Sequence, residues 1–318
     1  MQIDVFNGDA DGICALLQLR LADPIKSQLV TGVKRDIQLL DDVKVQHGDH
    51  VTVLDISFQK NRSSVDRLLD EGANIFYIDH HQAGEIPKHK HLKTLIDTDP
   101  NTCTSLLIND YLEGKFHEWA VTGAFGDNLF EAAIKSAYPL SLSKNQLEQL
   151  KMLGICINYN GYGTSVADLH FAPDLLYREM LPYSSPFDFM ADNEEVYEKL
   201  LAGYSDDMAS AEHINPEYQT DKVAVYTFPD EIWSRRVNGV FGNSLANKNP
   251  DRAHAVASFN AQNGYQISVR APLNNKMGAD ELCSLFPTGG GRKAAAGINH
   301  IAVEDLPSFI SAFEAKYV

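Results

Sequence analysis

The alternation of strand and helix in the first 80 residues is the feature that most limits how this chain can fold. Apolar strands are predicted at 3–6, 51–56 and 74–78, and helical segments at 13–22 and 59–71. A strand that is followed by a helix and a second strand forms a parallel pair through a right-handed crossover. The pattern therefore predicts an α/β domain with a doubly wound parallel sheet and helices on both faces.

A second α/β pattern follows a largely helical middle region. Residues 103–204 are mostly helical, with an interruption at 158–163, and the second pattern begins at Lys222 with strands at 223–226 and 266–269. The polar helix around 193–211 has the character of a connection between domains. We predict three parts, namely a metal-binding catalytic domain at 1–190, a helical linker at 191–220 and a smaller α/β substrate-binding domain at 221–318.

The charge of the chain is large, negative and unevenly distributed. The net charge is −16, yet the residues from Lys222 onward carry ten basic and eight acidic side chains, against 17 and 35 before them. Because a long duplex binds through many neutralised phosphates, this balance excludes a long duplex as a partner. A short anion that is held by a few arginines and metal ions is compatible with it. We therefore expect a small phosphorylated substrate.

The composition predicts an ordinary cytoplasmic protein. Hydrophobic residues make up 44% and charged residues 22% of the chain, which is typical of globular domains. No apolar run approaches the roughly 20 residues that span a bilayer, and residues 1–5 show no leader pattern. The four cysteines are far apart in the sequence, so we expect reduced thiols rather than a disulfide frame or a zinc site.

Carboxylates and histidines follow the predicted strands and one helical segment. They are Asp9, Asp11, Asp55, Asp79, His80, His81 and Asp127. Ligands collect beyond the carboxyl ends of parallel strands, so these side chains can converge. Mg²⁺ and Mn²⁺ prefer carboxylate oxygens, and imidazole suits Mn²⁺ as well. Two such ions can activate a water and clamp a phosphate for in-line attack.

Each piece of this pattern has an ordinary alternative. An Asp after a strand is often a helix cap or a turn residue, which applies to Asp9, Asp11 and Asp55. The pair His80-His81 can equally be surface polar residues, and Asp127 can mark a helix end. The combination in this order is far more specific than any of its parts.

In the order Asp-x-Asp-Gly, strand-Asp, Asp-His-His and Gly-Asp, the sequence resembles the four motifs of the DHH phosphoesterase family. The C-terminal part resembles the companion DHHA1 domain, through Ser268-Val269-Arg270 and the run GGGRKAAAG that begins at Gly289. The resemblance covers almost the whole chain. It favours the nanoRNase-like branch of oligoribonucleases, which includes phosphodiesterases of the linear dinucleotide pGpG.

The resemblance implies a role for each residue. Two Mn²⁺ ions, with Mg²⁺ as the alternative, would be bound by Asp9, Asp11, Asp55, His80 and Asp127, with Asp55 between the ions. His81 and Asp79 would be catalytic residues, His81 by contacting the phosphate or moving a proton and Asp79 by orienting its neighbours. Substrate would be bound by Arg270, Gly289, Gly290, Gly291 and Arg292.

Two positions depart from the family pattern. Asn7 lies where many members have a further acidic or histidine ligand, so the assignment within Asn7, Asp9 and Asp11 is open by one step. Arg292 stands where the family commonly has a histidine after the three glycines. A guanidinium can still hold a phosphate by two hydrogen bonds.

The expected function is a manganese-dependent phosphodiesterase that cleaves short oligonucleotides or linear dinucleotides to mononucleotides. One alternative is a phosphatase that acts on 3′-phosphoadenosine 5′-phosphate. A second is a nucleotide-binding module without catalysis. The expected partner is a short nucleotide, with neither a membrane nor a long duplex, and a homodimer is compatible with the sequence.

Overall fold

A computed structural model of the chain describes residues 1–260 and 262–317. Residues 261 and 318, which both fall in the expected second domain, lie outside the described residues. The chain divides into two compact units, one made of Met1–Gly161 and Ser165–Leu201 and the other of Tyr162–Thr164 and Ala202–Val318. The three-part division expected from the sequence stays a prediction, because compactness assigns no role to either unit.

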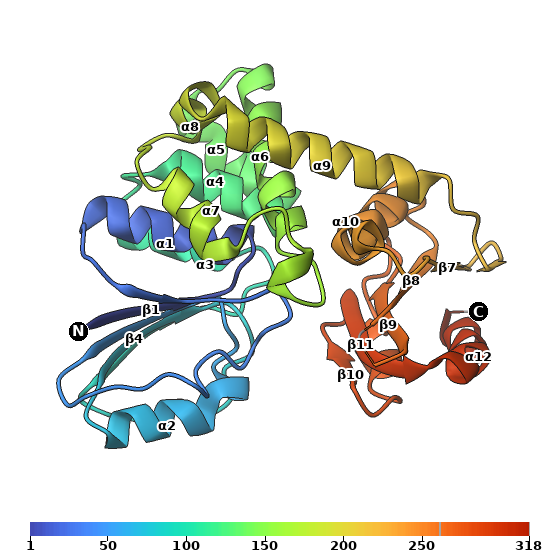
Figure 1. The fold of residues 1–318 in the computed structure, drawn as a ribbon, viewed down its shortest axis with the longest axis horizontal. Coiled ribbons are helices and arrows are strands. Elements are labelled where there is room, and N and C mark those ends of the chain that lie inside the picture. Colours follow the sequence, from blue (N-terminus) through green and yellow to red (C-terminus); the bar gives the residue numbers. More distant parts are fainter. Residues whose placement is uncertain (261, 318) are drawn as a thin grey trace. The chain divides into compact units, whose positions relative to one another are not determined.

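A five-stranded parallel sheet forms the centre of the first unit, in the order β2-β1-β3-β4-β5. The strands are β1 Gln2–Phe6, β2 Gln28–Val30, β3 His50–Leu54, β4 Asn74–Asp79 and β5 Leu92–Ile96. Because the chain leaves β1 to one side and later continues on the other, the sheet is doubly wound. Figure 1 shows α1 (Ala10–Ala22) and α2 (Arg62–Asp70) on opposite faces of this sheet, which confirms the predicted fold class.

The alternation of side chains along the strands explains these two layers. Val51 and Val53 of β3 pack in one core cluster with Val65 and Leu68 of α2, because side chains two residues apart lie on the same face of a strand. The intervening positions face α1, which is buried along almost its whole length. The strands are therefore apolar on both faces, as buried parallel strands usually are.

Further helices complete the first unit and lead into the second. They are α3 Thr104–Tyr111, α4 His117–Gly126, α5 Phe130–Ala137, α6 Lys144–Asn160, α7 Pro173–Met180, α8 Pro186–Asp192 and α9 Glu194–Glu212. The expected interruption at 158–163 begins later than predicted, because α6 continues to Asn160. Tyr159 in its last turn is fully buried and is hydrogen-bonded through its hydroxyl to Nε2 of His170 at 2.8 Å. This contact, together with the hydrogen bonds between Asn160 and the backbone of Phe171, ties the last turn of α6 to the segment that follows it.

A mixed six-stranded sheet forms the second unit, in the order β10-β11-β9-β8-β7-β6. Its elements are β6 Tyr218–Gln219, β7 Val223–Thr227, α10 Ile232–Lys248, β8 Ala253–Phe259, β9 Gly264–Arg270, α11 Ala279–Cys283, β10 Gly289–Gly291, β11 Ala295–Ala302 and α12 Leu306–Tyr317. Ala255 of β8 belongs to one core cluster with Phe309 and Phe313 of α12. On the other face, Asn238 of α10 donates to Ser258 at 2.8 Å. The sheet thus lies between α10 and α12.

Within residues 1–260 and 262–317, no helix combines the length and the apolar character that a membrane-spanning helix requires.

Candidate metal centre

The carboxyl ends of the central strands bring polar residues side by side. Leu54 of β3 is paired with Ile78 of β4, and the backbone N–H of Asp55 extends this ladder by donating to the Ile78 carbonyl at 3.0 Å. On the other side, the N–H of Asn7 donates to the Leu54 carbonyl at 3.2 Å. Asp55 therefore lies between the end of β1 and Asp79, which is the last residue of β4.

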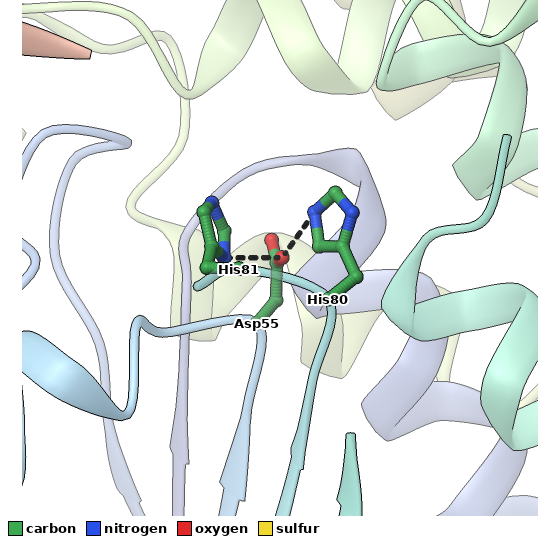
Figure 2. Close-up of side chains that lie close together, drawn as sticks. All are labelled: Asp55, His80 and His81. Atoms are coloured by element: carbon green, nitrogen blue, oxygen red, sulfur yellow. Dashed lines mark ion pairs between the residues drawn. The ribbon is translucent and has the colours of Figure 1, made fainter. Parts of the chain in front are cut away.

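Asp55 is held in an unusual backbone conformation. Its φ of 59° lies in the left-handed region, and the residue is buried. Among residues with a β-carbon, Asp and Asn adopt this region most readily, and such conformations cluster at functional sites. The turn directs the carboxylate away from the strand and toward the histidines that follow β4, as Figure 2 shows.

The ring of His80 is fixed by one hydrogen bond and faces three carboxylates. Its Nδ1 lies 3.0 Å from the Thr102 carbonyl, which can only accept, so Nδ1 carries the proton. In the neutral ring, Nε2 then carries a lone pair. This atom lies 3.3 Å from Oδ1 of Asp55, 3.9 Å from Oδ2 of Asp11 and 3.8 Å from Oδ2 of Asp127. An imidazole whose other nitrogen donates to a carbonyl is the usual form of a metal-ligating histidine.

Asp11 is positioned by the first turn of α3. Its two oxygens accept hydrogen bonds from the backbone N–H groups of Thr104 at 2.8 Å and Ser105 at 2.7 Å. The hydroxyl of Thr104 also donates to Oδ1 of Asp55 at 3.3 Å. The start of α3 therefore holds two of the carboxylates that surround His80.

Asp79 is fully hydrogen-bonded and orients His81. Its Oδ1 accepts from the backbone N–H of His80 at 2.8 Å and lies 2.7 Å from Nδ1 of His81, while Oδ2 accepts from the N–H of Phe58 at 3.2 Å. A carboxylate can only accept, so Nδ1 of His81 carries a proton. The side chain of His81 is 27% exposed, which places this ring at the open side of the cluster. Asp55, His80 and His81 offer ligand atoms within 4.8 Å of one another.

Asp127 reaches the cluster because three helices approach closely. It caps the carboxyl end of α4, directly after Gly126. A β-carbon on Gly126 would lie 2.2 Å from the β-carbon of Ala10 in α1 and 2.7 Å from the Gly154 carbonyl in α6. Only glycine permits this approach. A carboxylate at this end of a helix also meets the negative end of the helix dipole, which favours a nearby cation.

The concentration of carboxylates has a clear electrostatic effect. Burial raises the pKa of the Asp55 carboxyl well above its usual range, and the negative charges of Asp11, Asp9, Asp127 and Asp79 raise it further. By contrast, the buried carboxylate of Asp4 at the other end of the sheet is held by Arg20 at 2.5 and 2.8 Å.

The cluster therefore has the charge of a cation site. A divalent ion among Asp11, Asp55, His80 and Asp127 would offset the repulsion, and this donor set suits Mn²⁺. The thiols are poor candidates for a nucleophile, since burial raises the pKa of Cys14 and of Cys103.

A lysine also enters the cluster. Nζ of Lys34 donates to Oδ2 of Asp9 at 2.5 Å and to Oδ1 of Asn158 at 2.8 Å, and it lies 3.7 Å from Oδ1 of Asp127. The other oxygen of Asp9 caps α1 by accepting from the N–H of Gly12 at 3.1 Å. The expected ligands thus fall into two groups, with Asp9 beside Lys34 and the others around His80.

Sequence reasoning missed Lys34, Asn158, Thr102 and Thr104. Lys34 lies in the connection after β2, where no motif marks it. Asn158 lies in the segment 158–163, where the sequence predicted an interruption between helices. Only the structure shows that β2 lies beside β1, so that the connection after β2 begins at the same edge of the sheet.

In the second unit, Arg270 is fixed by neutral acceptors. It donates to Oδ1 of Asn243 at 2.6 Å, to Oγ of Ser268 at 2.9 Å and to the carbonyls of Val269 and Gly239 at 3.1 and 3.2 Å. In residues 1–260 and 262–317, no carboxylate forms an ion pair with it. Its positive charge is therefore not offset by a carboxylate of the described chain, although the side chain is rigidly placed.

The three glycines form a short edge strand rather than an open loop. Gly290 in β10 is paired with Gly297 in β11, and a β-carbon on Gly290 would meet nothing within 4 Å. The N–H of Arg292 donates to the Ala295 carbonyl at 2.9 Å and closes a tight turn. Because Ala295 is also paired with Arg270, the structure brings Arg270 and Arg292 to the same end of this sheet.

The chain was compared with known proteins. No protein-family model and no curated protein matches it. Among solved structures, an exonuclease RecJ bound to manganese matches with a TM-score of 0.60 and 18% identity over 99% of this chain and 89% of that one. RecJ from Thermus thermophilus in complex with Mn²⁺ matches with a TM-score of 0.62 and 18% identity. This match covers 99% of the present chain and 51% of that RecJ chain. The pGpG-specific phosphodiesterase PggH from Vibrio cholerae gives 0.57 and 14%, over 99% of both chains.

The chain has the RecJ fold. The match extends over both units, so the expected α/β fold of two units is confirmed. Within this fold, the polar cluster lies at the carboxyl ends of the strands of the first sheet. This is the edge where doubly wound sheets bind their ligands.

Proposed function

We propose that the chain is a metal-dependent phosphoesterase of the DHH/DHHA1 type that uses Mn²⁺. The observation that carries this proposal is the arrangement around Nε2 of His80, with carboxylate oxygens of Asp55, Asp127 and Asp11 at 3.3, 3.8 and 3.9 Å. One imidazole and three carboxylates from four separate segments are a donor set for Mn²⁺, with Mg²⁺ as the alternative. The solved RecJ structures with manganese support the choice of ion.

In this proposal each residue of the cluster has a defined task. Asp11, Asp55, His80 and Asp127 would hold the ion, which supplies a water of lowered pKa and positive charge beside the phosphate. His81 is kept by Asp79 in the form that carries a proton on Nδ1. Its other ring nitrogen can then accept a proton or, once protonated, donate to a phosphate oxygen. Asp79 would be a positioning residue that acts through His81.

We propose short oligonucleotides and linear dinucleotides such as pGpG as substrates. Arg270 and Arg292 would bind the phosphate or the base in the second unit, and the edge strand Gly289–Gly291 would allow a ligand to approach the backbone closely. The acidic first half of the chain disfavours a long duplex. The similarity to a pGpG-specific phosphodiesterase over the whole chain supports this size of substrate.

A product assay on the purified chain tests this function. Separate reactions with Mn²⁺ would contain pGpG, a longer single-stranded RNA, a cyclic dinucleotide and 3′-phosphoadenosine 5′-phosphate, with products resolved by chromatography. We expect mononucleotides from pGpG at the highest rate. Turnover of 3′-phosphoadenosine 5′-phosphate alone would favour the phosphatase alternative. Mn²⁺ binding without turnover of any of the four would leave the non-catalytic binding module.

A further inference from the structure

We propose that the ammonium group of Lys34 replaces one of the two expected cations, so that the centre holds a single divalent ion. This inference rests on the proposed function, and it assigns a role to a residue that no motif marks. Nζ of Lys34 lies 2.5 Å from Oδ2 of Asp9, 2.8 Å from Oδ1 of Asn158 and 3.7 Å from Oδ1 of Asp127. These three oxygens surround the ammonium as ligands surround an ion.

The two oxygens of Asp127 divide the cluster into two parts. Oδ1 lies 3.7 Å from the ammonium of Lys34, and Oδ2 lies 3.8 Å from Nε2 of His80. Asp11 and Asp55 approach His80, whereas Asp9 contacts Lys34. The His80 part retains an imidazole and three carboxylates for a metal ion. The Lys34 part already contains a positive charge.

Charge also favours one ion over two. The carboxylates that face the two parts are Asp9, Asp11, Asp55 and Asp127. One divalent ion and the ammonium together supply three positive charges against these four negative ones. Two divalent ions and the ammonium would supply five, and the second ion would share Oδ2 of Asp9 with an ammonium that already lies 2.5 Å from that oxygen. Two cations on one buried carboxylate oxygen repel each other strongly.

The backbone around Lys34 is fixed, so the ammonium is a built-in part of the centre. The N–H of Lys34 donates to the Gly161 carbonyl at 2.8 Å, and its carbonyl accepts from the side chain of Asn7 at 3.3 Å. A β-carbon on Gly8 would lie 1.9 Å from the Gly32 carbonyl, so the two connections are in direct contact. Asn7, the residue that departs from the family pattern, thus supports the lysine.

The ammonium also has a use in the reaction. A lysine beside a metal ion can hold a non-bridging phosphate oxygen and stabilise the charge that develops in the transition state. Unlike a second metal ion, the ammonium group cannot dissociate into solution. Lys34 would therefore be a catalytic residue that combines the charge of a second cation with permanent attachment to the chain.

Counting bound Mn²⁺ tests the proposal without substrate. The full-length chain would be saturated with Mn²⁺, and the bound metal would be measured by elemental analysis after removal of free ion. We expect one Mn²⁺ per chain in the wild type and in Lys34→Arg, which keeps the charge. We expect two in Lys34→Met, with the altered electron paramagnetic resonance spectrum of two nearby ions. Lys44→Met removes an exposed lysine of the same unit and should leave one.

Each other outcome has a distinct meaning. Two Mn²⁺ ions per wild-type chain, together with phosphodiesterase activity, would overturn the role of Lys34 and leave the proposed function intact. One Mn²⁺ in a folded Lys34→Met variant would likewise overturn it, because the ammonium would then not occupy the place of an ion. If circular dichroism shows that Lys34→Met does not fold, the Mn²⁺ content of the wild type and of Lys34→Arg decides between one ion and two. One Mn²⁺ per chain in both supports the proposal, and two in either overturns it. No bound Mn²⁺ in the wild type would overturn both proposals.

Discussion

Asp79 and His81 are joined by a contact of 2.7 Å between a carboxylate oxygen and Nδ1 of the ring. This contact fixes which ring nitrogen of His81 carries the proton. The side chain of Asp79 is buried and hydrogen-bonded to Phe58, His80 and His81, whereas His81 lies at the open side of the cluster.

Replacing Asp79 by Asn should slow the reaction without removing the metal. The Asn side chain has one acceptor oxygen where Asp79 has two, so either His81 or Phe58 loses its acceptor. Loss of such a supporting contact typically lowers metal affinity or activity by 10–100-fold. We expect kcat to fall by roughly that factor, while the Mn²⁺ content stays at the wild-type value. Asp66→Asn, at a half-exposed surface ion pair, is the control. A rate within twofold of the wild type would show that Asp79 does not act through His81.

Replacing Asp55 by Asn should stabilise the metal-free protein at neutral pH. Burial and four carboxylates raise the pKa of Asp55, so its ionised form destabilises the folded state above the unfolded pKa of about 4. The penalty is complete above the folded pKa and disappears as the pH falls toward 4. Each kcal/mol of this penalty that the Asn substitution removes should raise Tm by about 2–4 °C.

The measurement for Asp55 is Tm in the presence of a chelator, from pH 7.5 to pH 4.5. The difference between Asp55→Asn and the wild type should be largest at high pH and should shrink on acidification. Asn tolerates the left-handed backbone at this position, so strain does not obscure the comparison. A difference that does not change with pH would contradict the electrostatic account.

Replacing Gly126 by Ala should destabilise the first unit and weaken metal binding. The new β-carbon would lie 2.2 Å from that of Ala10, and overpacking of this kind costs about 1–3 kcal/mol. The resulting shift of α4 would move Asp127 away from His80. We expect a lower Tm and a larger Kd for Mn²⁺. Gly290→Ala adds the same carbon where nothing lies within 4 Å, and it should leave both values unchanged. An unaltered Tm in Gly126→Ala would refute this account of the packing.

Replacing Arg292 by Ala should raise KM for the dinucleotide far more than it lowers kcat. A hydrogen bond between charged groups contributes about 1.5–3 kcal/mol, so we expect KM to rise by about tenfold or more. Lys222→Ala removes an exposed positive charge from the same unit and is the matched control. If KM does not change in Arg292→Ala, Arg292 does not bind the substrate.

The sequence predicted the parts of this protein that depend on local pattern. The strands around 51–56 and 74–78 are visible because apolar runs end in turn residues, and Asp55 and Asp79 follow them directly. Lys34 could not be predicted, because its contact with Asn158 joins residues that are 124 positions apart. That contact depends on how α6 packs against the connection after β2. The polar run at 158–163 was also misleading, because α6 continues to Asn160 and its last turn includes Tyr159, which contacts His170.

The anchoring of Asp11 has a consequence for how samples of this protein should be handled. Both of its oxygens already accept hydrogen bonds from the start of α3, so part of the negative charge is shared with the backbone before an ion arrives. Contacts of this kind orient a ligand in advance, and their loss typically lowers metal affinity or activity by 10–100-fold. We therefore expect the site to take up metal from dilute buffer, so that a chelator is needed whenever the metal-free protein is prepared.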